Sequence, residues 1–255
     1  MVASLTLTAF DDVPTVARGD DLAALIVAAA ERARVDLRND DVLVLAQKIV
    51  SKSEGRAVRL DSVQASDRAR ELAKAADKDP RVVELILQES TEVLRVRPGA
   101  IVVVHRLGFV LANAGIDASN VEPERGAETV LLLPENPDAS AERIRADIRR
   151  LAGADVGVIV NDSFGRAWRL GTVGTAIGAA GLPGLLDMRG TPDRTGRALR
   201  VTEVGIADEL AAAASLLMGQ AAEGRPIVHV RGFPYPRRDG NASELIRPKH
   251  MDMFR

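Results

Sequence analysis

Cysteine is absent from the 255-residue chain, and aromatic residues make up only 3% of it. Without cysteine the chain has no disulfide framework, no cysteine nucleophile and no zinc–thiolate site. The longest apolar run lies within residues 22–30, far short of the roughly 20 residues that span a bilayer. The start, MVASLTLTAF, has neither the basic nor the apolar segment of a signal peptide. We therefore expect a cytoplasmic protein that does not enter a membrane.

The chain also lacks a strong excess of either charge. Its formal net charge is −2, with 27% charged and 46% hydrophobic residues, which is ordinary globular composition. Nucleic-acid-binding domains are usually strongly basic, so we expect no nucleic-acid partner. The length is enough for one large domain or two small ones.

Familiar catalytic and nucleotide-binding motifs are missing as well. The sequence has no G-x-x-x-x-G-K-[ST], no G-x-G-x-x-G between a strand and a helix, no H-E-x-x-H and no G-x-S-x-G. Its three histidines are far apart, and His105 and His229 fall in or beside apolar runs, where we expect structural roles. Candidate chemistry is therefore confined to polar clusters near the ends of apolar runs.

Hydrophobic periodicity predicts a mixture of helices and strands. Helices are expected at 20–34, at 64–90 as two helices broken near Pro80, at 138–151 and over most of 201–219. Strands are expected at 41–46, 155–160, 226–232 and, as two short strands, within 100–117. Residues 171–190 carry too many glycines for a regular helix. Because helices and strands do not alternate strictly, the pattern predicts an α+β fold of an irregular mixed α/β kind.

The first polar cluster is AQKIVSKSEGR, directly after the strand at 41–46. Lys48 and Lys52 share one face if this segment is helical. A lysine there would bind phosphate as a point charge; the alternative is a solvated basic turn.

A second cluster, NAGIDASN, holds Asp117 and Asn120 after a turn that Gly115 permits. The alternative for Asp117 is an Asx-type turn, in which it caps a backbone amide.

The third cluster, VNDSFGRAWRLG, places Asp162 and Ser163 directly after an apolar run. A carboxylate there is costly unless it is paired or metal-bound. Arg166 offers a structural ion pair as the alternative. Trp168 is expected to pack as an anchor rather than to stack on a ligand.

In the fourth cluster, VTEVGIADE, Glu203 is either a further ligand or part of a solvated face. If these carboxylates converge, each close pair costs about 4 kcal/mol near a surface, and a divalent cation removes that cost. Oxygen ligands without Cys or His favour Mg²⁺ or Mn²⁺, which commonly bridge carboxylates to nucleotide phosphates. The sequence alone does not establish convergence.

Four segments in this order, AQKIVSKSEGR, AGIDASN, VNDSFGRAWRLG and VTEVGIADELAAAASLLMGQ, together resemble the coenzyme F420-0:γ-glutamyl ligase family. The resemblance runs from RGDDLAALIVAAA to ELIRPKHMDMFR, almost the whole chain. It implies that residues 1–255 form a single catalytic unit of two closely packed subdomains in a homodimer. An alanine- and glycine-rich stretch, 174–186, also favours a dimer contact because it permits close backbone approach.

The resemblance further implies an activity. The family adds L-glutamate to coenzyme F420-0 through a γ-linked amide, hydrolyses GTP and requires divalent cations such as Mg²⁺ or Mn²⁺. Phosphorylation of the F420-0 carboxylate to an acyl phosphate is the chemistry we expect. The alternative is a deazaflavin-binding module, or an oxidoreductase that uses the finished coenzyme, without ligase activity.

Residue by residue, the resemblance assigns two groups of side chains. The metal ligands would be Asp117, Asp162, Ser163 and, as a further ligand, Glu203. The nucleotide contacts would be Asp12, Val13, Pro14, Thr15, Gln47, Lys52 and Asn120. Arg166 would neutralise a phosphate or carboxylate of a substrate, which makes Asp117, Asp162 and Arg166 the expected catalytic residues.

Overall fold

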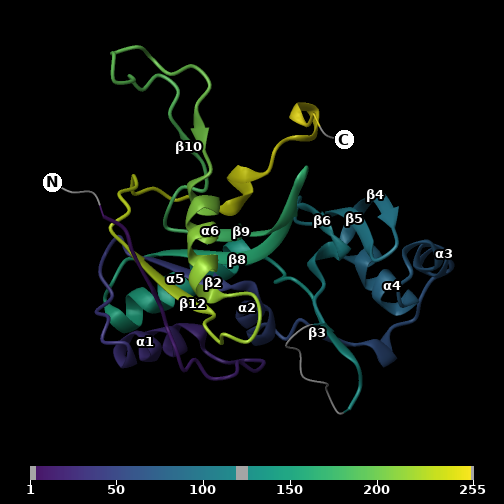
Figure 1. Ribbon diagram of the computed structural model, residues 1–255. Helices are drawn as coiled ribbons and strands as arrows, with labels where there is room; N and C mark the ends of the chain where they lie inside the picture. Colours follow the sequence, from purple (N-terminus) through teal and green to yellow (C-terminus); the bar gives the residue numbers. More distant parts are fainter. Residues whose placement is uncertain (1–3, 119–125, 254–255) are drawn as a thin grey trace.

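The computed structural model describes residues 4–118 and 126–253, and its centre is a five-stranded sheet (Figure 1). The strand order is β1-β12-β2-β8-β9. These strands are β1 (Thr6–Ala9), β12 (Ile227–Arg231), β2 (Val42–Ala46), β8 (Gly157–Arg166) and β9 (Arg169–Ala180). Only β2 and β8 run parallel, in the register Val42↔Gly157 to Ala46↔Asn161. Their carboxyl ends therefore meet at one edge of the sheet.

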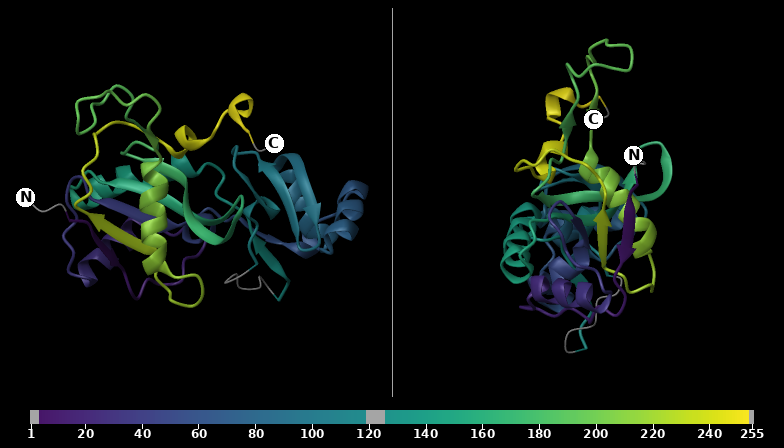
Figure 2. Two further views of the ribbon diagram at one scale, coloured as in Figure 1. Left: turned by 45° about the horizontal axis from the view of Figure 1, so that its top comes forward. Right: turned by 90° about the vertical axis from the view of Figure 1, so that its left-hand side faces the viewer.

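Helices cover both faces of this sheet (Figures 1 and 2). On one face lie α1 (Leu22–Arg32), α2 (Gln47–Ser53) and α5 (Pro137–Ala152), and on the other lies α6 (Ile206–Met218). Residues of β8 alternate between the two cores: Val158 and Val160 face the first, and Ile159 faces the second. A strand buried on both faces reads as an unbroken apolar run, as the sequence predicted for 155–160.

A second unit lies beside the sheet, on the right in Figure 1. It comprises α3 (Asp67–Ala76), α4 (Pro80–Gln88) and a three-stranded antiparallel sheet of β4 (Ser90–Arg97), β5 (Ala100–His105) and β6 (Val110–Ala112). Ser66 and Asp79 cap the two helices, and Pro80 begins the second, so the predicted break near Pro80 is confirmed. A short pair, β3 (Ala57–Arg59) with β7 (Thr129–Leu131), links this unit to the main body. The mixed α/β fold class is therefore confirmed.

A buried charge network ties the second unit to the main body. Glu89, just after α4, accepts a hydrogen bond from the Arg56 guanidinium at 2.9 Å and from that of Arg106 at 3.0 Å. The Nε2 of buried His105 lies 3.4 Å from the same carboxylate. Arg56 also donates to the carbonyl of Leu133 at 2.8 Å. Because Arg56 and Leu133 belong to the chain segments that enter and leave the second unit, the network fixes both connections.

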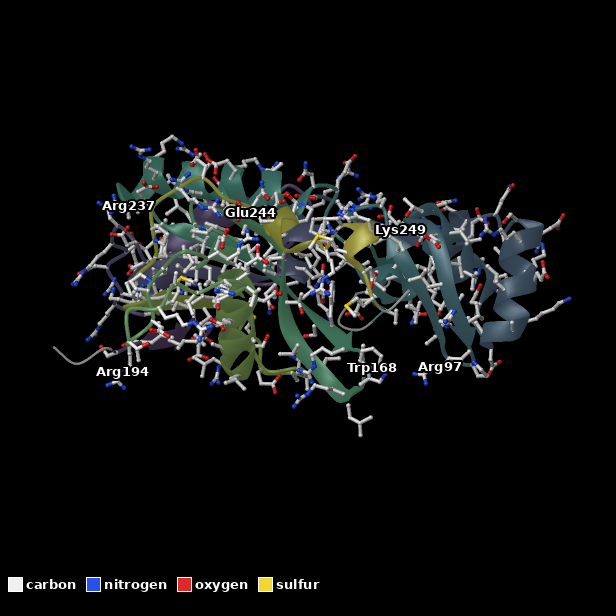
Figure 3. All side chains as sticks on the ribbon, turned by 90° about the horizontal axis from the view of Figure 1, so that it is seen from above. Arg97, Trp168, Arg194, Arg237, Glu244 and Lys249 are labelled. Atoms are coloured by element: carbon white, nitrogen blue, oxygen red, sulfur yellow. The ribbon has the colours of Figure 1, made fainter. Side chains whose placement is uncertain are left out.

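The strand predicted at 155–160 is longer than the apolar run. It continues through Asn161, Asp162 and Ser163 to Arg166 and pairs with β9 in a long hairpin. Trp168 lies in the tight turn of this hairpin and is 80% exposed, so the prediction that it packs as an anchor is wrong. Figure 3 shows Trp168 at the outer end of the hairpin.

The glycines of β9 serve contacts within the chain. A Cβ at Gly174 would collide with the backbone of Ala211 in α6, and one at Gly178 with the backbone of Pro137 in α5. Helices on both faces therefore approach β9 closely because these positions carry no side chain. Gly174 and Gly178 thus serve contacts with the chain's own helices, and the dimer contact expected in the stretch 174–186 stays a prediction.

The remaining elements are short. β10 (Leu186–Asp187) and β11 (Glu203–Val204) pair at the base of an arm that projects from the main body (Figure 1). Short 3-10 helices lie at Leu60–Ser62, Asn113–Gly115, Ala242–Leu245 and Lys249–Met251. Across residues 4–118 and 126–253, no helix combines the length and apolar character that crossing a bilayer requires.

Candidate active site

A cleft of about 590 Å³ opens where β2 and β8 end side by side. Its walls come from the loop before α1, the start of α2, the bridge residue Asp117, the middle of β8 and the loop after α6. The polar residues that line it are Thr15, Gln47, Lys48, Lys52, Asp117, Asn161, Asp162, Ser163, Gln220 and Arg225. The cleft therefore lies at the edge where the carboxyl ends of parallel strands commonly form ligand sites.

The basic side of the cleft comes from α2. This helix begins at Gln47, immediately after β2, so Lys48 and Lys52 lie one turn apart and both line the cleft. The Gln47 side chain is buried, and its Oε1 accepts a hydrogen bond from the Ser51 hydroxyl at 2.8 Å. The prediction that the lysines share a helix face is confirmed.

The acidic side of the cleft contains Asp117 and Asp162. Asp117 is held by a two-way backbone bridge to Leu131, with N···O distances of 3.0 and 2.8 Å. Its Oδ2 lies 2.6 Å from the Nζ of Lys48. In this structure Asp117 therefore forms an ion pair with Lys48 across the cleft.

Asp162 carries a perturbed carboxyl group. Burial raises its pKa to about 6, and the negative charge of Asp117 adds to the rise. A hydrogen bond from the Ser163 amide, at 2.7 Å, and the charge of Lys48 oppose it. Burial and repulsion together outweigh the stabilisation of the charged form, as expected for two neighbouring carboxylates.

Arg166 is not the partner of Asp162 in this structure. Its guanidinium instead donates to the carbonyl of Leu170 at 3.2 Å, across the turn of the hairpin. Asp162 and Arg166 are four residues apart on an extended strand, which separates them by about 13 Å. The structural ion pair offered as an alternative is therefore not formed.

Gln220 and Asn161 are among the cleft residues that were missed as site residues from the sequence. Ser163 donates a hydrogen bond from its hydroxyl to the Oε1 of Gln220 at 2.9 Å, although Gln220 follows α6 and is distant in sequence. Asn161 is buried, donates to the Ser215 hydroxyl at 3.1 Å, and leaves its Oδ1 without a hydrogen-bond partner.

The structure brings most of the expected site residues together. Those that line the cleft are Val13, Pro14, Thr15, Gln47, Lys52, Asp117, Asp162 and Ser163. Asp12 precedes this loop in a left-handed conformation, and its carbonyl accepts a hydrogen bond from Arg32. Asn120 lies outside the described residues.

Two expected site residues lie elsewhere. Glu203 belongs to β11, where its carboxylate is 3.3 Å from the Arg189 guanidinium. Arg166 lies at the exposed end of the hairpin. Neither lines the cleft, because β11 and the hairpin turn extend away from the ends of the parallel strands.

The donor set suits an oxygen-preferring divalent cation. Asp117 and Asp162 supply two interacting carboxylates, and Ser163 supplies a hydroxyl beside them. No cluster of three or more His, Asp or Glu side chains able to hold a metal occurs in the described part of the chain. Mg²⁺ is commonly held by one or two carboxylates together with substrate phosphates, so the residues present fit such an ion.

The fold and the cleft define a mixed α/β enzyme whose site combines carboxylates and lysines at the ends of parallel strands. Residues 12–232 match the family described as F420-0:Gamma-glutamyl ligase. The chain therefore belongs to that family, as its four segments predicted, and is an enzyme of the ligase class.

Curated relatives cover nearly the whole chain. The coenzyme F420:L-glutamate ligase of Methanothermobacter thermautotrophicus is 46% identical over 253 residues, 98% of this chain and 99% of the relative. The protein of the same name from Methanopyrus kandleri is 47% identical over 244 residues, 93% and 92% of the two chains. That from Archaeoglobus fulgidus is 42% identical over 245 residues, 96% and 94%.

Proposed function

We propose that this chain is a GTP-dependent ligase that adds L-glutamate to coenzyme F420-0 through a γ-linked amide, in coenzyme F420 biosynthesis. Family membership and the names of its relatives support the ligase chemistry. The observation that carries the proposal is the meeting of Asp117, Asp162 and Ser163 with Lys48 and Lys52 in one cleft. A cleft with this pairing of charges suits a nucleotide and an oxygen-bound cation.

The nucleotide would lie along the basic side of the cleft. Lys52 would contact its phosphates as a point charge, while Gln47 and the loop Val13–Pro14–Thr15 would contact the remainder. We propose Asp12 and Asn120 as further contacts. Asp117, Asp162 and Ser163 would hold Mg²⁺ or Mn²⁺, which when bound would offset the negative charge of the phosphates.

We leave Glu203 and Arg166 out of the proposed centre. Glu203 already has Arg189 as a partner, and Arg166 lies at the exposed end of the hairpin.

In the proposed reaction a carboxylate oxygen of F420-0 attacks the γ-phosphorus of GTP. The bond to the bridging oxygen breaks, which yields GDP and an acyl phosphate. The amine of L-glutamate then attacks the acyl carbon, loses a proton and displaces inorganic phosphate. The chain's own residues mainly position the groups and neutralise charge, as in other phosphoryl transfers. This fits a cleft that is lined by lysines and carboxylates and by no histidine among the described residues.

We also propose a homodimer. Large apolar side chains are exposed at the end of the hairpin, where Trp168 is 80% and Leu170 99% accessible. Contiguous patches of exposed apolar side chains commonly mark an association surface. The cytoplasmic location expected from the sequence stays a prediction.

Mass spectrometry of the reaction tests the proposed function. Purified protein would be incubated with GTP, Mn²⁺, L-glutamate and F420-0, and each would be omitted in turn. A product heavier by one glutamyl unit, formed together with GDP only in the complete mixture, is the expected result. Nucleotide binding without product would favour a binding module. Binding of the finished coenzyme without GTP hydrolysis would favour an oxidoreductase.

A further inference from the structure

A second, smaller cavity lies at the free edge of β9, the last strand of the central sheet. Three parts of the chain enclose it: the β5–β6 turn, the β8–β9 hairpin with the start of α6, and the C-terminal segment. An ion pair of 2.9 Å between Lys249 and Glu92 of β4 holds that segment against the second unit (Figure 3). Cavities between structural units are common ligand sites.

The cavity combines two aromatic walls with charges of both signs. Phe109 and Phe164 meet edge to face, with ring centroids 5.9 Å apart. Asp208 of α6 is half-buried, and its Oδ1 accepts a hydrogen bond from the Ala176 amide at 2.9 Å. That bond fixes the carboxylate at the wall of the cavity. Ala176 lies at an irregularity in the pairing of β8 with β9.

Arg247 supplies the positive charge. It lines the cavity from the C-terminal segment, and its side chain is exposed. Asp252, from the same segment, adds a second carboxylate. A guanidinium suits a carboxylate, which it binds through two parallel hydrogen bonds.

We propose that this cavity binds the amino-acid substrate, L-glutamate, with Arg247 on a carboxylate and Asp208 on the amino group. The proposal rests on the ligase function argued above. Phe109 and Phe164 would pack against the methylene groups. The volume, about 250 Å³, is below the roughly 300–1,000 Å³ of pockets for drug-sized ligands. It therefore suits an amino acid better than a tricyclic deazaflavin.

The cavity and the larger cleft are lined by neighbouring strands, β9 and β8. Thr175 of β9 is the register partner of Asp162 of β8, and paired residues lie on the same face of a sheet. Thr175 lines the smaller cavity, and Asp162 lines the cleft. An amino acid held beside Thr175 would therefore lie one strand away from Asp162 and the cleft.

Two isosteric changes test the assignment. In Arg247→Gln the positive charge is lost, and in Asp208→Asn the carbonyl still accepts the Ala176 amide. For each variant, KM would be measured separately for L-glutamate, GTP and F420-0. Binding of radiolabelled L-glutamate without the other substrates would be measured by equilibrium dialysis. Arg68→Gln and Glu209→Gln are matched controls, because both side chains are exposed and neither lines the cavity.

We expect the KM and Kd for L-glutamate to rise about tenfold or more in both variants, the usual loss for one charge-assisted hydrogen bond. KM for GTP and F420-0 should stay at the wild-type values, which a merely structural role would not produce. A rise confined to F420-0 would overturn the assignment and give the cavity to the deazaflavin. Unchanged constants for L-glutamate, or no saturable glutamate binding by the wild type, would also overturn it. A wild type that binds L-glutamate but forms no product would instead contradict the proposed ligase function.

Discussion

Lys48 and Asp117 form an ion pair across the candidate active site, with the ammonium nitrogen 2.6 Å from the carboxylate oxygen. The two residues are distant in sequence, and each is about 30% exposed. Because Asp117 is also a candidate metal ligand, the lysine and a divalent cation would compete for the same carboxylate. An ion that binds there must share Asp117 with Lys48 or displace it.

Lys48→Gln should strengthen the binding of Mn²⁺ in the absence of nucleotide. Removing a positive charge next to the carboxylates removes a repulsion that is of order 1–4 kcal/mol at close range before screening by salt. We expect several-fold tighter binding, measured from the electron paramagnetic resonance signal of free Mn²⁺. Lys74→Gln, an exposed lysine of α3, should leave the affinity unchanged. An affinity equal to that of the wild type in Lys48→Gln would show that Asp117 does not hold the ion.

Lys52→Ala should weaken GTP binding while the fold stays intact. Loss of one charge-assisted contact to a phosphate typically costs about 1.5–3 kcal/mol. Isothermal titration calorimetry with GTP and Mn²⁺ measures the change, with Lys74→Ala as the control. Unchanged GTP affinity would remove Lys52 from the nucleotide site.

The end of the β8–β9 hairpin should carry the dimer contact. The double change Trp168→Ser and Leu170→Ser removes two large apolar side chains that contribute little to the core, since both are highly exposed. We expect light scattering to give a monomer mass of 27.2 kDa, where the wild type gives a dimer. Leu216→Ser is the matched control, because Leu216 is 85% exposed on α6. A double variant that remains dimeric would place the interface elsewhere.

Glu89→Gln should destabilise the folded protein at neutral pH. Burial alone would raise the pKa of Glu89, but His105, Arg56 and Arg106 outweigh it and hold the pKa at about 2. A depressed carboxyl pKa contributes stability that is present above about pH 4.5 and is lost as the pH falls toward 2. By this linkage the contribution is on the order of 3 kcal/mol at neutral pH.

Urea unfolding of Glu89→Gln and wild type at neutral pH and near pH 3 measures this contribution. The difference in unfolding free energy should shrink at the lower pH. Glu71→Gln, an exposed position on α3, should behave as the wild type at both. A difference that does not vary with pH would contradict a charged Glu89.

The hydrophobic pattern of single segments predicted those parts of the site that one strand and the residues directly after it form. The apolar run at 41–46 ends where AQKIVSK begins, and a strand followed directly by a helix places Gln47, Lys48 and Lys52 at one sheet edge. Asp162 and Ser163 follow an apolar run of the parallel neighbour, so they arrive at the same edge. Because β2 and β8 pair in parallel, the residues that follow these two strands line the same cleft.

Contacts between distant segments escaped prediction for a physical reason. The extension of β8 to Arg166 depends on pairing with β9, since Asn161, Asp162 and Ser163 have no strong strand preference of their own. The bonds Lys48–Asp117 and Ser163–Gln220 join elements whose approach the whole fold decides. Periodicity within one segment carries no information about such partners.

Asp162→Asn gives the sharpest test of the metal site. Because burial and Asp117 raise the pKa of Asp162 to about 6, the native protein binds more protons than the unfolded chain between about pH 4 and pH 6. Stability due to this group therefore falls as the pH rises through that window, and the cost stays constant above it. Asparagine removes the cost, so with a chelator present the variant should melt at a higher temperature than the wild type near pH 8. The gain should be on the order of 2–3 kcal/mol, and it should vanish near pH 4.

The variant should also lose the stabilisation that Mn²⁺ with GDP gives to the wild type by ligand linkage. Asp67→Asn, on the exposed first turn of α3, is the control and should change neither quantity. An Asp162→Asn protein that melts early yet responds fully to Mn²⁺ and GDP would contradict both the perturbed carboxyl group and the metal site.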